Sequence, residues 1–313
     1  MTQARRWVAK DFGGPEVLEE TLVDLAAPGP GEVTVEVRAA GMNPADYKHF
    51  AAGQDSKLLP LTTGYEAAGV IVALGPDTAI ASGGGAAGDE VVAFQIFDGY
   101  SSTLNAPASD VFAKPSTLSF PEAANLLLVG TTAAETLHVV GLSTRETVLV
   151  HGAGGGVGTS VVQQARLRGA SVIGTASERD FDAVRRFGAT PVRYGLGLEA
   201  RVRELAAGRV DAAVDTVGVD EAIDVSLALV SDRDRVVSTA AFGRAARDGF
   251  QIVGATNPSS GPFRAAARPY VLDLAAHGKL AVPIGATFPL SDARRAVEAL
   301  AGRHPYGKLA LVA

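Results

Sequence analysis

Glycine residues crowd a short stretch in the middle of the chain, between an apolar run and a helical pattern. The stretch Gly152–Gly158 reads GAGGGVG and follows the valine- and leucine-rich run Val148–Val150. Such a turn lets the backbone approach a pyrophosphate with no Cβ in the way. The helix that follows would offer free N–H groups and a positive dipole end to this anion. The residues that we expect to bind a dinucleotide here are Gly154, Gly155, Gly156 and Val157.

The elements around this turn make the interpretation more specific. Apolar residues recur at helical spacing up to Leu167, Gly169 ends the helix, and Val172 opens a second strand. A strand, a turn, a helix and a strand form the context in which a glycine motif indicates a dinucleotide site. The spacing from Gly152 to Gly158 is GxxGxxG, because the first glycine of GxGxxG falls on Ala153. A turn that only caps a strand is the structural alternative.

The residue at the end of the second strand indicates whether the protein prefers NADPH or NADH. NAD enzymes carry an acidic residue there to hold the ribose 2′-hydroxyl, and the aligned residue here is Ala176. Ser177, Arg179 and, at the end of the next strand, Tyr194 can complete a pocket for a 2′-phosphate. Glu178 is the contrary feature, since it becomes the NAD-type acid if the strand runs two residues longer. The pattern therefore favours NADPH.

The composition excludes several classes of function. The chain has 313 residues, a net charge of −6 and no cysteine. The interspersed negative charge argues against nucleic acid and anionic membranes as partners. The lack of cysteine excludes disulfides, thiolate metal sites and thiol catalysis. No apolar run is long enough to span a bilayer and no signal peptide is evident, so we expect a cytoplasmic protein.

The periodicity predicts an α/β chain of two domains. Short strands and polar turns up to about residue 117 predict a small, mostly β domain. Two helices, Glu122–Val129 and Thr132–Val140, come next, and helices then alternate with strands up to a final strand at Phe250–Ala255. This alternation predicts a doubly wound parallel sheet. From Val282 the pattern returns to the first domain. We predict a β domain of residues 1–117 and 282–313 and a dinucleotide-binding domain of residues 118–281.

The doubly wound sheet also directs attention to its other strand ends. Ligands bind such sheets at the carboxyl ends of the strands. The candidate cofactor contacts that follow these ends are Val217, Ala240, Ala241 and Phe242.

Short sequence motifs along the whole chain resemble those of one protein family and occur in the same order. They include FGGPEVLE at Phe12–Glu19, GYEAAGVIVALG at Gly64–Gly75, VLVHGAGGGVG at Val148–Gly158 and GKLALV at Gly307–Val312. The chain is similar to the zinc-independent medium-chain dehydrogenases/reductases, in particular the NADPH:quinone oxidoreductases of the zeta-crystallin type. The resemblance implies a GroES-like, mostly β catalytic domain and a Rossmann domain that binds NADPH.

The resemblance also implies roles for individual residues. Asn43 matches the asparagine near the nicotinamide ring, although Asn-Pro is also a common start of a turn. Thr131 matches a contact of the carboxamide, and Lys308 matches a lysine that can reach the cofactor or lie in solvent. Tyr47 can polarise a substrate carbonyl, with a packed core aromatic as the alternative.

The substrate pocket itself is less defined by the sequence. Tyr65, Phe94, Phe97 and Tyr100 lie at expected strand ends, where they can line an apolar pocket or simply pack. Whether any side chain donates a proton to the substrate stays open.

The same resemblance predicts an enzyme without zinc. The zinc-dependent relatives carry a cysteine after the glycine where this chain has Gly41-Met42, and a histidine where it has Tyr65. We therefore expect an NADPH-dependent reductase of a small quinone or enone. An enoyl reductase of a biosynthetic pathway and an NADPH-binding protein with little turnover are the alternatives. The apolar stretch Phe250–Ala255, at the expected sheet edge, predicts a homodimer.

Overall fold

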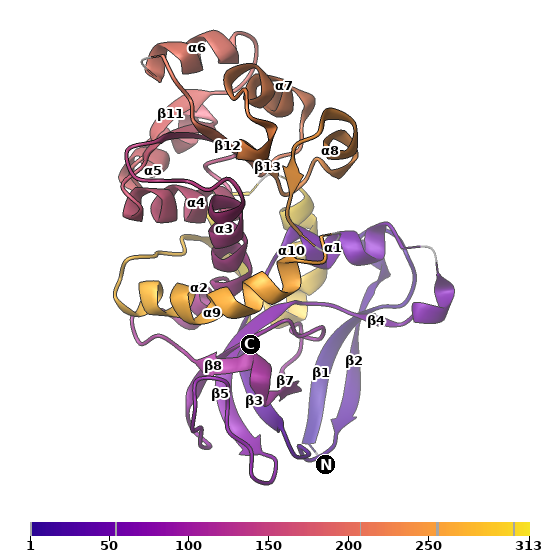
Figure 1. Ribbon diagram of the computed structural model, residues 1–313. Helices are drawn as coiled ribbons and strands as arrows, with labels where there is room; N and C mark the ends of the chain where they lie inside the picture. The colour runs from indigo at the N-terminus through magenta and orange to yellow at the C-terminus, as the bar shows by residue number, and fades with distance from the viewer. Residues whose placement is uncertain (1, 54, 207, 255–256, 303) are drawn as a thin grey trace. The chain divides into compact units, whose positions relative to one another are not determined.

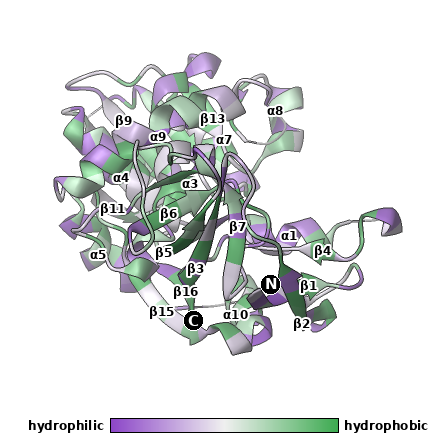
Figure 2. Ribbon diagram, turned by 90° about the horizontal axis from the view of Figure 1, so that it is seen from below, coloured by the Kyte–Doolittle hydropathy of each residue, from purple (hydrophilic) through white to green (hydrophobic). Residues whose placement is uncertain are grey.

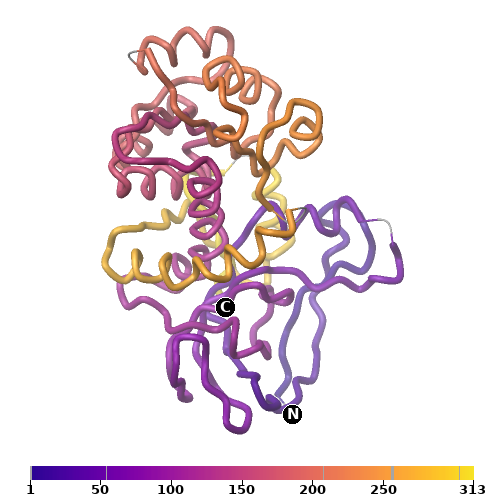
Figure 3. Tube along the Cα trace, viewed as in Figure 1, coloured from indigo at the N-terminus to yellow at the C-terminus, as the bar shows by residue number. Residues whose placement is uncertain are grey.

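The chain forms two compact units. The computed structural model describes residues 2–53, 55–206, 208–254, 257–302 and 304–313 (Figure 1). One unit comprises Met1–Leu128 and Val282–Ala313, and the other comprises Val129–Ala281. The first unit is therefore discontinuous in the sequence, and the path of the chain through each unit can be followed in Figure 3.

The first unit is built mainly from strands. Its larger sheet has the order β15-β16-β3-β5-β6-β8, with β7 also paired to β3, and its smaller sheet has the order β2-β1-β4. The strands are β1 (Thr2–Ala9), β2 (Leu18–Leu25), β3 (Glu32–Gly41), β4 (Leu61–Thr62), β5 (Glu66–Leu74), β6 (Glu90–Phe94), β7 (Thr103–Pro107), β8 (Val111–Ala113), β15 (Ile284–Pro289) and β16 (Lys308–Val312). The helices are α1 (Pro44–Ala51), α2 (Phe120–Ala123) and α10 (Ala293–Ala301), and α3 (Leu127–Val139) begins here.

Strand β3 is the centre of the larger sheet. It pairs antiparallel with β5, with β7 and with the C-terminal strand β16. Its residues Val33, Val35 and Val37 are buried in one apolar cluster with Ile71 and Leu104. These valines alternate with Thr34, Glu36 and Arg38, as expected for a strand with one face in the core. Figure 2 shows β3 and β5 in green, as hydrophobic strands.

The second unit contains a parallel sheet with the order β11-β10-β9-β12-β13-β14. All the pairings in this sheet are parallel. Its strands are β9 (Thr147–His151), β10 (Ser171–Ala176), β11 (Thr190–Arg193), β12 (Ala212–Asp215), β13 (Val236–Ser238) and β14 (Gln251–Ile252). The helices of this unit, after α3, are α4 (Gly156–Leu167), α5 (Phe181–Arg186), α6 (Leu198–Leu205), α7 (Asp220–Leu229), α8 (Phe242–Asp248) and α9 (Ser260–Ala276). The order of the strands is that of a Rossmann-like, doubly wound sheet, as predicted.

Strand β9 explains why the sequence before the glycine turn is apolar without alternation. Val148 and Val150 are buried in a cluster with Val161 of α4, whereas Leu149 is buried in another cluster with Ile223 of α7. Successive side chains of a strand point to opposite faces of the sheet. A strand that is covered on both faces must therefore be apolar at every position.

The segment between the units differs from the prediction. We expected residues 118–281 to form the second domain, but residues 118–128 belong to the first unit. The side chain of Asn125 accepts a hydrogen bond from the Met42 amide and donates to the Leu309 carbonyl, and the Leu128 amide donates to Glu66. These buried contacts tie the segment to β3, β5 and β16.

The helices in this segment also begin and end elsewhere. In place of the predicted helices Glu122–Val129 and Thr132–Val140, the structure has the short helix α2 and then α3, which crosses the predicted gap. The break lies at Asn125, whose side chain is used for the contacts with Met42 and Leu309.

The helices of both units are short or polar relative to a membrane span. Within the described parts of the chain, none combines the length and the apolar character that crossing a bilayer requires.

Candidate functional site

The carboxyl edge of the parallel sheet gathers most of the predicted cofactor residues. Because the strands are parallel, all their carboxyl ends meet at one edge of the second unit. The residues placed directly after these ends are Gly154–Val157 after β9, Ser177 and Arg179 after β10, Tyr194 after β11, Val217 after β12, and Ala240–Phe242 after β13. Thr131 lies in the same unit, fully buried within α3.

The glycine turn has the geometry that close approach of an anion requires. A Cβ on Gly158 would lie 2.1 Å from the carbonyl oxygen of Gly152, so this position accepts only glycine. Gly152 has a φ of +78°, which favours glycine as well. Gly155 is exposed and is the N-cap of α4, so the first amides of the helix point out of the turn. The turn therefore fits the pyrophosphate of a dinucleotide.

Two polar side chains fix the loops after β12 and β13, which lie on one side of β9 and its glycine turn. The Asp215 carboxylate accepts hydrogen bonds from the amides of Val217 and Gly218 at 3.0 and 3.1 Å. Ser238 donates to Asp215 at 2.5 Å and accepts from the amides of Ala240 and Ala241. Both side chains are fully buried. They therefore hold both loops in one conformation, and the sequence analysis assigned no role to Ser238.

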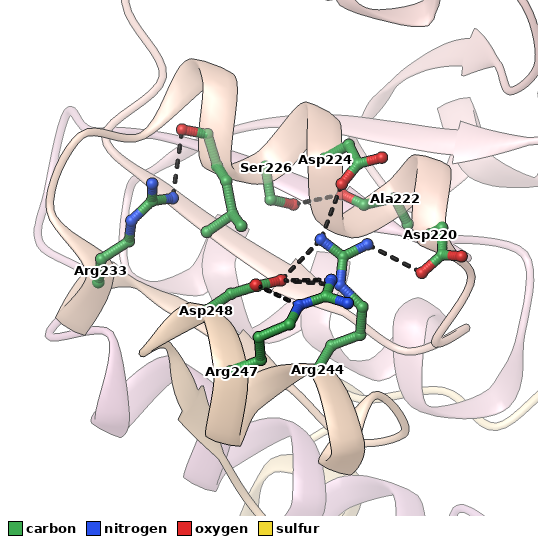
Figure 4. Close-up of polar contacts among 9 residues, drawn as sticks. Asp220, Ala222, Asp224, Ser226, Arg233, Arg244, Arg247 and Asp248 are labelled. Carbon is green, nitrogen blue, oxygen red and sulfur yellow. Dashed lines mark hydrogen bonds and ion pairs between the residues drawn. The ribbon is translucent and has the colours of Figure 1, made fainter.

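An ion-pair network joins α7 to α8, the helix that begins at Phe242. Arg244 of α8 forms ion pairs with Asp220 and Asp224 of α7 at 2.8 Å each (Figure 4). It also pairs with Asp248, the last residue of α8, at 2.7 Å. Arg247 also binds Asp248. These two guanidinium groups, Arg247 first, lower the pKa of Asp248 to about 2. The network fixes the helix that carries the predicted contact Phe242.

His151, the last residue of β9, is buried and neutral. Burial lowers its pKa to about 4, although Asp215 and Glu221 act in the opposite direction. Its Nε2 atom has no hydrogen-bond partner within the described residues. The position directly before the turn therefore supplies packing rather than charge.

The predicted phosphate ligands share one carboxylate. Ser177 donates to Asp180 at 2.5 Å, and Arg179 Nε lies 3.4 Å from the same carboxylate. A Cβ on Gly154 would lie 3.6 Å from this group, so Asp180 borders the glycine turn. Arg193, at the end of β11, pairs with the contrary residue Glu178 at 3.5 Å. Asp180 thus orients Ser177 and Arg179 beside the turn, a role that sequence reasoning did not identify.

The first unit holds a buried ammonium between polar groups from distant parts of the chain. Lys308 Nζ donates to the Met42 carbonyl and to Asn43 Oδ1 at 2.5 Å each. Asn43 Nδ2 in turn donates to Glu66 Oε1 at 2.9 Å. Burial lowers the pKa of Lys308 and raises that of Glu66, and each charge opposes the shift of the other. Asn43 and Lys308 are therefore brought together, with the asparagine side chain held between an ammonium and a carboxylate.

Asp46 is a second buried carboxylate in this unit. It accepts hydrogen bonds from the Asn43 amide, the Tyr100 hydroxyl and the Tyr65 amide at 2.7, 3.0 and 3.2 Å. Burial raises its pKa to about 7, against these donors and the charge of Lys308. Asp46 therefore fixes the start of α1 and the backbone at Tyr65.

The two remaining candidates of the first unit are placed differently. Lys308 is buried, so the alternative of a lysine in solvent is not what the structure shows. Tyr47 packs edge-on against Phe50, with ring centroids 5.7 Å apart, beside the core of the unit. Its ring therefore has the packed environment that the sequence analysis gave as the alternative to a catalytic role.

In a chain without cysteine, a metal centre requires several His, Asp or Glu side chains close together. In the part of the chain that the structure describes, no three His, Asp or Glu residues cluster in a way that could hold a metal ion. Tyr65, at the position of the zinc-binding histidine, has its hydroxyl 2.9 Å from Nδ1 of His49.

We predict that Lys308→Met destabilises the protein by about 3–5 kcal/mol, because it leaves the buried carboxylates of Glu66 and Asp46 without their cation. Urea denaturation of wild type and variant measures this change. Lys279→Met, at an exposed lysine, is the matched control and should stay within about 0.5 kcal/mol. Equal effects of the two substitutions would contradict the role given to Lys308.

The comparisons with known proteins agree with this architecture. Residues 29–139 match the family of alcohol dehydrogenase GroES-like domains, and residues 156–257 match the zinc-binding dehydrogenases. Human quinone oxidoreductase is 36% identical over 176 residues, which cover 54% of this chain and 52% of the relative. The chain spans about half the length of the mammalian relatives it matches, which are named quinone oxidoreductases or synaptic vesicle membrane protein VAT-1 homologues.

Solved structures extend the similarity over the whole chain. The quinone oxidoreductase of Pseudomonas syringae is 30% identical, with a TM-score of 0.84 and coverage of 99% of this chain and 100% of the other. A mycobacterial protein solved in complex with NADPH is 29% identical, with a TM-score of 0.84 and the same coverage. The chain therefore belongs to the medium-chain dehydrogenase/reductase family, among its quinone oxidoreductase-like members.

Proposed function

We propose that this protein is an NADPH-dependent reductase that passes a hydride to a quinone or another conjugated carbonyl compound, without zinc. The observation that carries the proposal is the carboxyl edge of the parallel sheet, where the glycine turn and the fixed loops after β12 and β13 meet. The cofactor, when bound, supplies the hydride from C4 of its nicotinamide. The chain supplies binding and orientation.

Several contacts support NADPH over NADH. The end of β10 carries no acid at Ala176, and Ser177 and Arg179 follow within three residues. Arg179 is exposed, and a planar guanidinium can donate two hydrogen bonds to a phosphate. Glu178 is exposed and paired with Arg193, so it is oriented toward an arginine rather than free to hold a ribose hydroxyl. A 29% identical protein has been solved with NADPH, which supports the same choice.

The absence of zinc is supported by residue chemistry. The chain has no cysteine, so no thiolate can bind a metal. Asn43 and Tyr65 are engaged with Lys308, Glu66 and His49. A quinone or an enone is already electrophilic, so positioning and a hydrogen bond to its oxygen suffice in place of a Lewis acid. The names of the relatives favour quinones among such acceptors.

We predict that the purified protein oxidises NADPH when 9,10-phenanthrenequinone is present, and that dialysis against EDTA leaves the rate unchanged. The nicotinamide absorbance measures the rate, and a panel of enones and enoyl thioesters is the comparison. Preference for an enoyl thioester would favour the enoyl reductase alternative. Loss of the rate on dialysis, with recovery on adding zinc, would show that the reaction requires the metal.

We predict that Arg179→Ala weakens NADPH about ten- to a hundredfold, since one charge-assisted contact contributes roughly 1.5–3 kcal/mol. NADH, which lacks the 2′-phosphate, should bind nearly as before. Calorimetric titration of both cofactors measures the difference, and Arg203→Ala on α6 is the control for loss of a surface arginine. If both cofactors weaken equally, or neither weakens, Arg179 is not the phosphate ligand.

We propose a homodimer as the working form. The edge strand β14 is short and comprises Gln251 and Ile252, and its pairing partner on the inner side is β13. The predicted apolar stretch extends to Ala255, which lies outside the described residues. A sheet edge with free backbone groups tends to pair with a second copy. We expect light scattering at micromolar concentration to give the mass of two chains, and a single-chain mass would reject the dimer.

A further inference from the structure

A hydrogen-bonded tyrosine–histidine pair lies in the first unit, beside the buried Lys308 cluster. Tyr65 Oη is 2.9 Å from Nδ1 of His49, and the two rings stack with an interplanar angle of 13°. Phe97 packs edge-on against Tyr65 with ring centroids 5.4 Å apart, and 58% of Phe97 is exposed. An apolar ring beside a phenol hydroxyl suits a flat, conjugated carbonyl compound.

The backbone of Tyr65 is held in place from two directions. Its amide donates to Asp46 at 3.2 Å, and its carbonyl accepts from the Ile96 amide at 3.3 Å. The preceding residue, Gly64, has a φ of +98°, and a Cβ there would lie 2.6 Å from the Tyr100 ring. The turn before Tyr65 therefore requires glycine, and the phenol is carried by a rigid segment, as a group that must meet a substrate should be.

The pair adjoins Asn43, the residue that the family resemblance implies near the nicotinamide. Glu66 follows Tyr65 directly and accepts the hydrogen bond of the Asn43 side chain. His49 lies on α1, the helix for which Asn43 is the N-cap. The helix α1, with Asn43 at its N-cap, and the start of β5 thus hold Asn43 and the pair in one region of the first unit.

Resting on the proposed function, we propose that Tyr65 donates the proton that accompanies the hydride and that His49 replaces it. Reduction of a quinone adds a hydride, which carries both electrons, and one proton. The O–H bond of Tyr65 breaks as an O–H bond forms on the acceptor oxygen that has gained negative charge. Protonated His49 then returns a proton from Nδ1 to Tyr65 Oη and takes another from solvent. The sum is NADPH, quinone and one proton converted to NADP⁺ and hydroquinone.

The surroundings of each partner suit its role. Burial and, after it, the charge of Asp46 raise the pKa of Tyr65, so the phenol stays protonated until it donates. His49 is exposed, so its ring can exchange protons with water. Charged groups around the pair include Asp46 at the Tyr65 amide, Lys48 next to His49 and Asp98 next to Phe97 in the sequence, and Glu66 and Lys308 in the adjoining cluster.

Two other tyrosines of this unit are less suited to donate a proton. Tyr100 is fully buried and its hydroxyl donates to Asp46. Tyr47 packs against Phe50 beside the core. The Tyr65 hydroxyl, by contrast, is paired with a group that can return the proton.

The test compares Tyr65→Phe and His49→Asn with wild type, with Tyr270→Phe on α9 as the matched loss of a phenol elsewhere. Tyr65→Phe should lower kcat with 9,10-phenanthrenequinone about a hundredfold, as expected for loss of a general acid. The Kd for NADPH should stay within about twofold, because the phenol acts on the acceptor. Wild-type kcat should depend on pH, and His49→Asn should remove this dependence. Tyr270→Phe should match wild type.

A second measurement does not depend on turnover. The NMR signals of the His49 ring should differ between wild type and Tyr65→Phe, because the hydroxyl that contacts Nδ1 is gone. If wild type reduces quinones and Tyr65→Phe reduces them equally well, the proton relay is wrong and the proposed function stands. Unchanged His49 ring signals in Tyr65→Phe would also reject the relay alone. If no quinone or enone supports NADPH oxidation by the wild-type protein, the proposed function fails and the relay fails with it.

Discussion

The first unit depends on one buried ammonium. Lys308 is the first residue of the C-terminal strand β16, and its Nζ atom binds the Met42 carbonyl and the Asn43 side chain directly after β3. Burying a lysine is costly unless carboxylates and hydrogen bonds compensate, and Glu66 and Asp46 provide this compensation. The interaction therefore ties together segments that are more than 250 residues apart in the chain (|i−j| = 266 for Lys308 and Met42). It also fixes Asn43 and, through Asp46, the backbone of Tyr65.

In the second unit, buried hydrogen bonds fix the loops at the carboxyl edge of the parallel sheet. Asp215 and Ser238 satisfy the amides of Val217, Gly218, Ala240 and Ala241 from within the fold. The Arg244 network does the same for α8 from the surface, with screened and individually weak ion pairs that share one guanidinium. A cofactor that binds to such an edge meets a surface that is already ordered, which lowers the cost of binding.

Local patterns in the sequence predicted the parallel sheet, the glycine turn and the return of the chain to its first domain, because each follows from periodicity or backbone geometry. The position of residues 118–128 was not predictable in this way, since it depends on Asn125 contacting residues that are distant in the chain. The same reason applies to the site. The turn residues were predicted from glycine spacing, whereas the roles of Ser238 and His49 arise from contacts between separate segments. Asp180 was missed because its position beside Gly154 depends on the fold. A polar residue at the end of an apolar strand is the sequence signal that could have identified Ser238.

The proposed reaction is the transfer of a hydride from NADPH to a conjugated carbonyl compound by the chain itself, without a metal. The most direct measurement is a single turnover of the EDTA-treated protein, with NADPH that carries deuterium or hydrogen at the transferred position of C4. The account predicts that the nicotinamide absorbance decays on mixing with a quinone, and that it decays more slowly with the deuterated cofactor. NADPH that stays bound while its absorbance persists would contradict the account and identify a cofactor-binding protein with little turnover.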